Sequence, residues 1–115
     1  ITLICSVSLA TYNVGDLISD FTLPDTDNNS VSLSDFNGKV FLLTSGVLVE
    51  VFAAEAPLTE EIWQDYENEW VQVISIGVGE SQAVAQSWKE EHKLTYPVLY
   101  DPNFIVWNLF GMGYI

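Results

Sequence analysis

Three short apolar runs, kept apart by two stretches with helical spacing, do most to limit the folds open to this chain. The runs occupy residues 40–43 (Val-Phe-Leu-Leu), 71–77 (Val-Gln-Val-Ile-Ser-Ile-Gly) and 97–100 (Pro-Val-Leu-Tyr). Their length and their content of β-branched residues predict three strands. The first run is continuously apolar, which is typical of a strand that is covered on both faces.

The stretch at residues 53–70 has the spacing of an amphipathic helix. Leu58, Ile62 and Tyr66 recur every four residues, and the acidic residues of the stretch lie mostly elsewhere around the helix. This spacing predicts a helix with those three side chains on its apolar face.

Two more helices are predicted after residue 80. Ser81 is suited to be the N-cap of the first, which turns Val84, Trp88 and Leu94 toward the core. The last helix opens at residues 101–103 (Asp-Pro-Asn), with proline near its first position and a glycine after its end. Strands that alternate with helices form βαβ units, so the pattern predicts an α/β fold with helices packed on a parallel sheet.

A hairpin is predicted ahead of the first apolar run. Residues 20–23 read as a short strand, and residues 25–30 as a turn, because Asn and Asp hydrogen-bond their own backbone and tolerate left-handed conformations. Residues 31–34 alternate apolar and polar side chains, which favours a partner strand.

The composition and charge of the chain exclude several function classes. The 115 residues, 49% of them apolar, provide for one domain with one core. Sixteen acidic residues face three lysines, which gives a formal net charge of −13. This charge repels phosphate backbones and anionic lipid surfaces, so we expect neither nucleic-acid binding nor membrane-surface binding.

The first twelve residues have the character of a secretory signal. Residues 1–10 are apolar with small residues at their end, and Ser8-Leu9-Ala10 has the small-x-small form that signal peptidase cuts. We expect residues 1–12 to be the remnant of a signal peptide, which predicts an extracytoplasmic protein, periplasmic or anchored on the outer face of the membrane; an N-terminal strand is the alternative.

Cys5 is the only cysteine, so the chain as given is not expected to perform thiol chemistry.

Three further patterns match known sites only in part. Asp25, Asp27 and Asn29 open like a calcium-binding loop, but the glycine and the bidentate glutamate that such a loop needs are missing, so we expect a turn. Gly-Val-Gly at residues 77–79 lacks the third glycine of a dinucleotide loop. His92 lacks a partner at ligand spacing and is expected to be a surface histidine. We therefore predict no metal and no cofactor.

Four stretches, in order, resemble the redoxin family, which comprises extracytoplasmic thioredoxin-like reductases and the alkyl hydroperoxide reductase/thiol-specific antioxidant proteins. The stretches are GDLISDFTLP at residues 15–24, VSLSDFNGKV at 31–40, AAEAPLTEEIW at 53–63 and LTYPVLYDP at 94–102. Each is weakly specific alone, and their common order carries the resemblance.

The resemblance implies a thioredoxin-like three-layer α/β/α fold with an N-terminal hairpin extension. The expected domain covers residues 13–115 and is incomplete, because the chain ends at Gly113-Tyr-Ile, before the cis-proline strand of the family. Intact members are thiol–disulfide or peroxide oxidoreductases of cell redox homeostasis. Their partners are a protein disulfide or peroxide substrate and a thiol electron donor.

The resemblance also places the family's catalytic cysteine pair. Counting back from the proline at Pro57 puts the two cysteines at Val49 and Phe52, with Leu48 where the family has tryptophan. Neither valine nor phenylalanine can form the thiolate that a helix N-terminus stabilises in such enzymes. The family often has an acid at the position of Glu55, where it assists proton transfer to the thiol.

Three hypotheses follow for a redoxin chain without its cysteines. The first is a redoxin domain, inactive in this copy, whose intact relatives reduce disulfides or peroxides. The second is a non-catalytic pseudo-enzyme that holds a peptide in the groove of the thioredoxin fold. The third is the product of a damaged reading frame. Three single-base deletions and one substitution would convert a plausible coding sequence of the family into the one that encodes residues 44–52 here. True evolutionary loss of the cysteines is the alternative.

Overall fold

The computed structural model describes residues 12–46, 48 and 53–110 of the chain. Its elements follow in the order β1 (Thr22–Pro24), β2 (Ser30–Ser32), the 3-10 helix η1 (Leu33–Phe36), β3 (Val40–Gly46), α2 (Ala56–Tyr66), β4 (Val71–Val78), α3 (Gln82–Glu91), β5 (Val98–Asp101) and α4 (Ile105–Phe110). None of the helices in these described ranges is long and apolar enough to cross a membrane.

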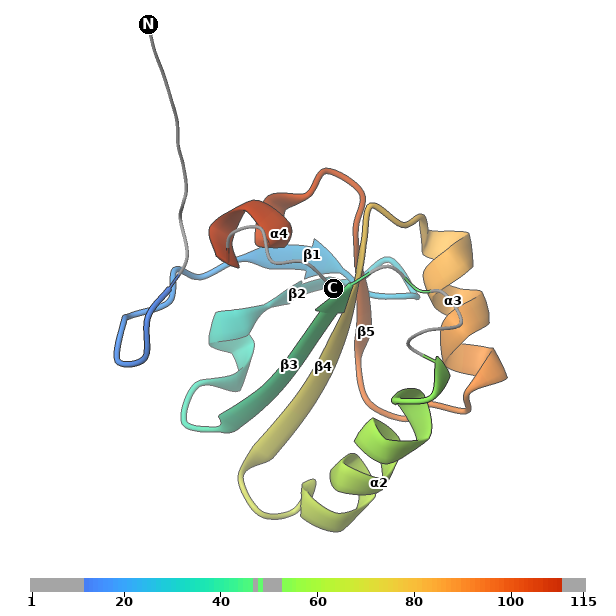
Figure 1. Cartoon of the computed structure of the whole chain (residues 1–115), viewed down its shortest axis with the longest axis horizontal. Coiled ribbons are helices and arrows are strands. Elements are labelled where there is room, and N and C mark those ends of the chain that lie inside the picture. Colours follow the sequence, from blue (N-terminus) through green and yellow to red (C-terminus); the bar gives the residue numbers. More distant parts are fainter. Residues whose placement is uncertain (1–11, 47, 49–52, 111–115) are drawn as a thin grey trace, which may run out of the picture.

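The three predicted core strands form one parallel sheet in the order β3-β4-β5 (Figure 1). Val40 pairs with Val71 at one end of β3 and β4, and Gly46 pairs with Gly77 at the other. Strands β1 and β2 form a separate antiparallel hairpin, which touches the sheet through a bridge between Asp25 and Leu99. The βαβ architecture and the hairpin extension are therefore confirmed.

The sheet lies between two layers, as expected of a three-layer α/β/α fold. On one face, α2 and α3 pack against alternate strand residues, with Ala56, Val73, Trp88 and Val98 among the buried side chains. On the other face, the hairpin and α4 cover Ile74, Ile76 and Leu99. Figure 1 shows α2 and α3 on one side of the strands and α4 on the other side.

The burial of the strands differs from the expectation for residues 40–43. Strand β3 is only half-buried along most of its length, with Gly46 as its one buried residue, whereas β4 is buried from Gln72 to Val78. The physical reason is position, because β4 has a hydrogen-bonded neighbour on both edges and β3 has one in the described part of the chain.

Helix α2 also turns a different face to the sheet from the one predicted. Leu58, Ile62 and Tyr66 are exposed, whereas Ala56 is buried and Trp63 packs against the core. The predicted stripe exists in the sequence, but small Ala56 and bulky Trp63, seven residues apart, form the stripe that contacts the sheet. The prediction for this face was wrong.

The last two helices match the sequence predictions in part. The Ser81 hydroxyl accepts a hydrogen bond from the Val84 N–H at 3.4 Å and caps α3, as predicted. Trp88 is buried, but Val84 is 40% exposed, and Ala85 takes its place in the core. Helix α4 begins at Ile105 and not beside the proline at residue 102.

The start of α4 is held by a carboxylate from β5. The buried Asp101 side chain accepts hydrogen bonds from the N–H groups of Ile105 at 2.8 Å, Val106 at 2.9 Å and Trp107 at 3.4 Å. These are N–H groups that a helix start leaves without intrahelical partners.

The turn of the hairpin is built by Asp25, as the sequence indicated. Its carboxylate accepts hydrogen bonds from the N–H groups of Asp27 and Asn29, both at 2.9 Å, and Asn28 adopts a left-handed φ of 62°. The partner strand ends earlier than predicted, because Ser32 and Asp35 form a capping box that starts η1.

Candidate functional site

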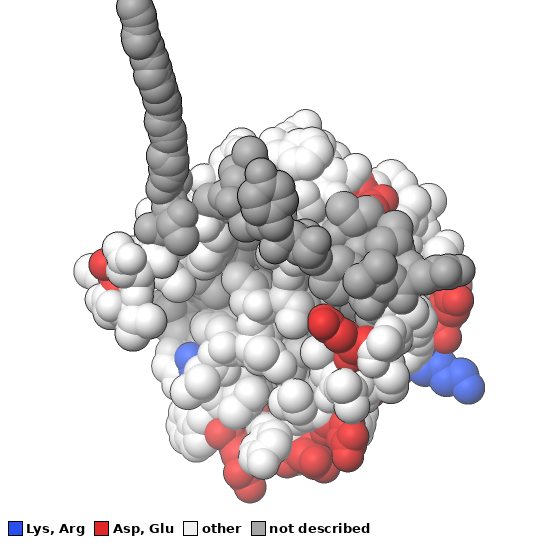
Figure 2. Space-filling model, viewed as in Figure 1, with Lys and Arg blue, Asp and Glu red and all other residues white. Residues whose placement is uncertain are grey.

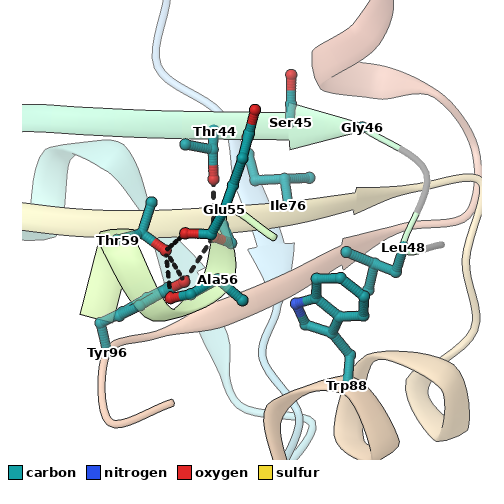
Figure 3. A pocket seen from close by; sticks show the side chains of 11 residues that line it. Thr44, Ser45, Gly46, Leu48, Glu55, Ala56, Thr59, Ile76, Trp88 and Tyr96 are labelled. Atoms are coloured by element: carbon teal, nitrogen blue, oxygen red, sulfur yellow. Dashed lines mark hydrogen bonds between the residues drawn. The ribbon is translucent and has the colours of Figure 1, made fainter. Parts of the chain in front are cut away.

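The carboxyl ends of β3 and β4 and the start of α2 surround a small cavity (Figure 3). It offers about 30 Å³ to the centre of a water molecule. Its walls are formed by β3, β4, α2, α3 and the segments before α2 and β5. The lining residues are Thr44, Ser45, Gly46, Leu48, Glu55, Ala56, Thr59, Ser75, Ile76, Trp88 and Tyr96. In open α/β sheets, ligands bind at the carboxyl ends of the strands. This cavity is therefore the candidate site.

One wall of the cavity depends on a glycine. Gly77 lies in β4 beneath Leu48, and a Cβ on this residue would come within 2.8 Å of Leu48 Cδ1. The Leu48 N–H also donates a hydrogen bond to Glu80 Oε1 at 3.3 Å. The absence of a side chain at Gly77 thus lets Leu48 pack over the end of the sheet, where it lines the cavity together with Trp88.

Four hydroxyl groups form a continuous chain beside the cavity (Figure 3). Thr44 Oγ1 lies 2.7 Å from Ser75 Oγ, and Ser75 Oγ donates to Tyr96 Oη at 3.2 Å. Tyr96 Oη lies 2.9 Å from Thr59 Oγ1, which donates to the carbonyl of Ala56 at 2.9 Å. The chain joins β3, β4, the segment before β5 and α2.

The carbonyl at the end of this chain fixes its direction. A carbonyl can only accept, so the single hydrogen of the Thr59 hydroxyl is used there and Tyr96 must donate to Thr59. Ser75 then donates to Tyr96, and Thr44 must donate to Ser75. Every hydroxyl hydrogen in the chain therefore points from Thr44 toward α2.

Helix α2 begins at the mouth of the cavity. Pro57 occupies its first turn, where a missing N–H removes no helical hydrogen bond. Glu55 directly precedes the helix, and its exposed side chain extends beside Thr44 (Figure 3). A carboxylate at this position is favoured by the helix dipole.

A shallow groove adjoins the cavity along α3. It is lined by Leu48, Ala83, Val84, Ser87, Trp88 and Glu91, and it shares Leu48 and Trp88 with the cavity. Its residues are mostly apolar or small. Acidic side chains are prominent around the end of the molecule where α2 lies, and few basic ones are visible (Figure 2).

Comparison with known proteins assigns the chain to a family. The sequence profile of the AhpC/TSA family matches residues 14–114, which include the described fold and the cavity. The chain belongs to the AhpC/TSA family.

One relative of this AhpC/TSA member is the thiol-disulfide oxidoreductase ResA of Geobacillus thermodenitrificans. The two are 31% identical over 101 residues, which cover 87% of this chain. The chain spans 58% of the length of that relative.

Two solved structures confirm the thioredoxin-like fold of the AhpC/TSA member. The thioredoxin domain of a thiol-disulfide oxidoreductase from Bacteroides vulgatus matches with a TM-score of 0.75 and 21% identity, covering 93% of this chain and 78% of its own. A secreted disulfide oxidoreductase of Mycobacterium tuberculosis matches with a TM-score of 0.71 and 18% identity, covering 79% and 67%.

The predicted positions of the family's cysteine pair, Val49 and Phe52, lie outside the described residues. Their described neighbours in sequence are Leu48 and Ala53, and both pack against the core cluster beneath α2 and α3. The assignment of the pair therefore stays a prediction.

Sequence reasoning missed the hydroxyl chain entirely. Thr44 and Ser75 are polar residues within strands of mostly apolar sequence, and this was the signal that could have indicated them. The two face each other because the parallel register pairs Thr44 with Ser75, which no local pattern reveals.

His92, which was predicted to be a surface histidine, is partly exposed and packs against Trp88. It is half-buried, and its ring lies 4.3 Å from that of Trp88, between centroids, at the end of α3. Within the described ranges, no three His, Cys, Asp or Glu side chains gather as they would to hold a metal ion.

Proposed function

We propose that this AhpC/TSA member is a redoxin domain that does not carry out thiol–disulfide or peroxide turnover. The proposal is supported by the sequence: the one cysteine is Cys5, and the positions that we assign to the family pair hold Val49 and Phe52. Exchange between thiols and disulfides requires an attacking thiolate. Valine and phenylalanine supply none.

The lineage of the domain is proposed to be that of extracytoplasmic thiol–disulfide oxidoreductases. The ResA relative is named for this activity, and the structural neighbour from M. tuberculosis is described as secreted. In such relatives the partners would be a protein disulfide or peroxide and a thiol donor. The small-x-small sequence at residues 8–10 supports a signal remnant over residues 1–12 and a domain over 13–115.

A turnover assay tests the first proposal. Reduction of insulin disulfides by dithiothreitol and reduction of hydrogen peroxide are measured with the chain and with its Cys5→Ser variant. We expect both proteins to match the rate without protein. Catalysis that survives in Cys5→Ser would contradict the proposal, since that variant contains no thiol.

We propose as a second function that the domain binds an extended polypeptide without redox chemistry. The groove along α3 favours this function, because it leads into the cavity through the shared residues Leu48 and Trp88. Its apolar walls can bury side chains, and the cavity supplies polar groups at one point, which is the usual composition of ligand sites.

Two matched substitutions test the binding function. Val84 is 40% exposed in the groove, and Val40 is 68% exposed at the opposite, amino end of β3. Affinity for a fluorescein-labelled, uncharged decapeptide is measured by anisotropy. We expect Val84→Glu to weaken binding at least fivefold and Val40→Glu to leave it unchanged. Equal effects of the two substitutions on affinity would exclude the groove as the peptide-binding site.

A further inference from the structure

The hydroxyl chain gives the cavity a wall that only accepts hydrogen bonds. Thr44 uses its one hydrogen on Ser75, so its oxygen can present only lone pairs to a ligand. Hydrogen bonds in a chain polarise one another, which makes the oxygen at the head of the chain a better acceptor. Glu55, which also lines the cavity, carries a second acceptor in its exposed side chain.

The opposite wall of the cavity carries a donor. The nitrogen edge of the Trp88 indole is turned toward the cavity (Figure 3). An indole N–H donates and cannot accept. The cavity therefore presents acceptors on the side of β3 and α2, and a donor on the side of α3.

The size of the cavity restricts the group that can enter it. A water molecule needs roughly 10–15 Å³ of space open to its centre. The cavity offers about 30 Å³, which is room for about two polar heavy atoms. The group must also carry a donor and an acceptor side by side, because the two walls differ.

We infer that the cavity binds a primary carboxamide, the end group of an asparagine or glutamine side chain in a bound polypeptide. The amide NH₂ donates to Thr44 and Glu55, and the amide oxygen accepts from the Trp88 N–H. A carboxylate of the same shape has no hydrogen to donate and is repelled by Glu55. This inference rests on the proposed binding of polypeptides in the adjoining groove.

A titration with three small compounds tests the inference. The probes are the Nα-acetyl methylamides of glutamine, glutamate and methionine, and the readout is the indole N–H signal of Trp88 in a ¹H–¹⁵N correlation spectrum, assigned with Trp88→Phe. We expect a saturable shift of this signal with the glutamine compound only. Equal responses to the three compounds, or none, would overturn the inference.

Variants of the hydroxyl chain make the test specific. Thr44→Val is expected to weaken binding of the glutamine compound at least fivefold, and Thr44→Ser, which keeps the hydroxyl, to restore it. In Tyr96→Phe, Ser75 loses its acceptor and can donate to Thr44 instead. The Thr44 hydroxyl can then donate to a carboxylate, so the ratio of the affinities for the glutamine and glutamate compounds should fall. Unchanged binding in Thr44→Val, with an otherwise unchanged spectrum, would contradict the inference.

The failure of this inference can be told apart from failure of the binding function. If decapeptides bind and Val84→Glu weakens them, but glutamine, glutamate and methionine are not distinguished, only the carboxamide site is wrong. If no decapeptide binds, the binding function itself is wrong.

Discussion

Tyr96 connects two strands to a helix through a single buried hydroxyl. It accepts from Ser75 and donates to Thr59, and its side chain is 1% exposed. Tyr96→Phe should lower the free energy of unfolding by about 1–2 kcal/mol, because buried Ser75 and half-buried Thr59 each lose a hydrogen bond. Urea denaturation measures this loss. Tyr66→Phe, at an exposed position on α2, is the control and should change it by less than about 0.5 kcal/mol.

Asp101 is another residue on which buried polar groups depend. Its carboxylate accepts hydrogen bonds from three backbone N–H groups at the start of α4. Asp101→Asn keeps the shape but places an NH₂ against these donors, so we expect a loss of about 2 kcal/mol in urea denaturation. Asp65→Asn on the exposed side of α2 should be nearly neutral. Equal stabilities of the two variants would show that the carboxylate does not hold the helix.

At the scale of elements, Asp20 ties the hairpin to η1 and makes this region sensitive to acid. Its carboxylate accepts hydrogen bonds from the Ser34 hydroxyl at 2.7 Å and from the Ser34 N–H at 2.9 Å. These bonds lower the pKa of Asp20 below its ordinary value of 3.8, and the bond from the Ser34 hydroxyl has the largest effect. Because the folded pKa is the lower one, the stabilisation is complete above the unfolded pKa and is lost as the pH falls through the folded pKa.

Carboxyl ¹³C shifts followed against pH check this assignment. In the unmodified chain, Asp20 should titrate below 3.8, and Ser34→Ala should move its pKa upward toward that value. A pKa that Ser34→Ala leaves unchanged would mean that Ser34 is not the cause.

Substitutions on the two apolar stripes of α2, one facing the core and one exposed, should differ in their effect on stability. Trp63 packs against the core and Leu58 is 59% exposed. Trp63→Ala should therefore cost about 2 kcal/mol in urea denaturation, and Leu58→Ala less than about 0.5 kcal/mol. A larger loss of stability for Leu58→Ala than for Trp63→Ala would mean that the face predicted from the sequence is the one that contacts the sheet.

The elements themselves were largely predictable, and their orientation was not. Apolar runs and Ser81 located β4, β5 and α3 because these signals are local. The face of α2 was not predictable, because periodicity finds an apolar stripe but does not say which stripe meets the sheet. The capping box at Ser32 could also be predicted from the sequence, but the alternation at residues 31–34 favoured a strand instead.

At the scale of the whole molecule, the fold and the family could be predicted from four ordered stretches of sequence. The cavity could not, because its walls come from residues far apart in the chain. Thr44 meets Ser75 only through the register of β3 and β4, and Tyr96 meets Thr59 only when α2 packs on the sheet. A single sequence does not specify such pairings.

We propose above all that a redoxin scaffold carries Val49 and Phe52 where its family keeps a cysteine pair. The most direct measurement introduces the pair as Val49→Cys/Phe52→Cys in a Cys5→Ser background. The control, Leu58→Cys/Glu61→Cys, places the same spacing on exposed positions of α2. We predict that the first variant forms an internal disulfide and accelerates insulin reduction at least tenfold over the control. A rate no higher than that of the control would contradict the claim.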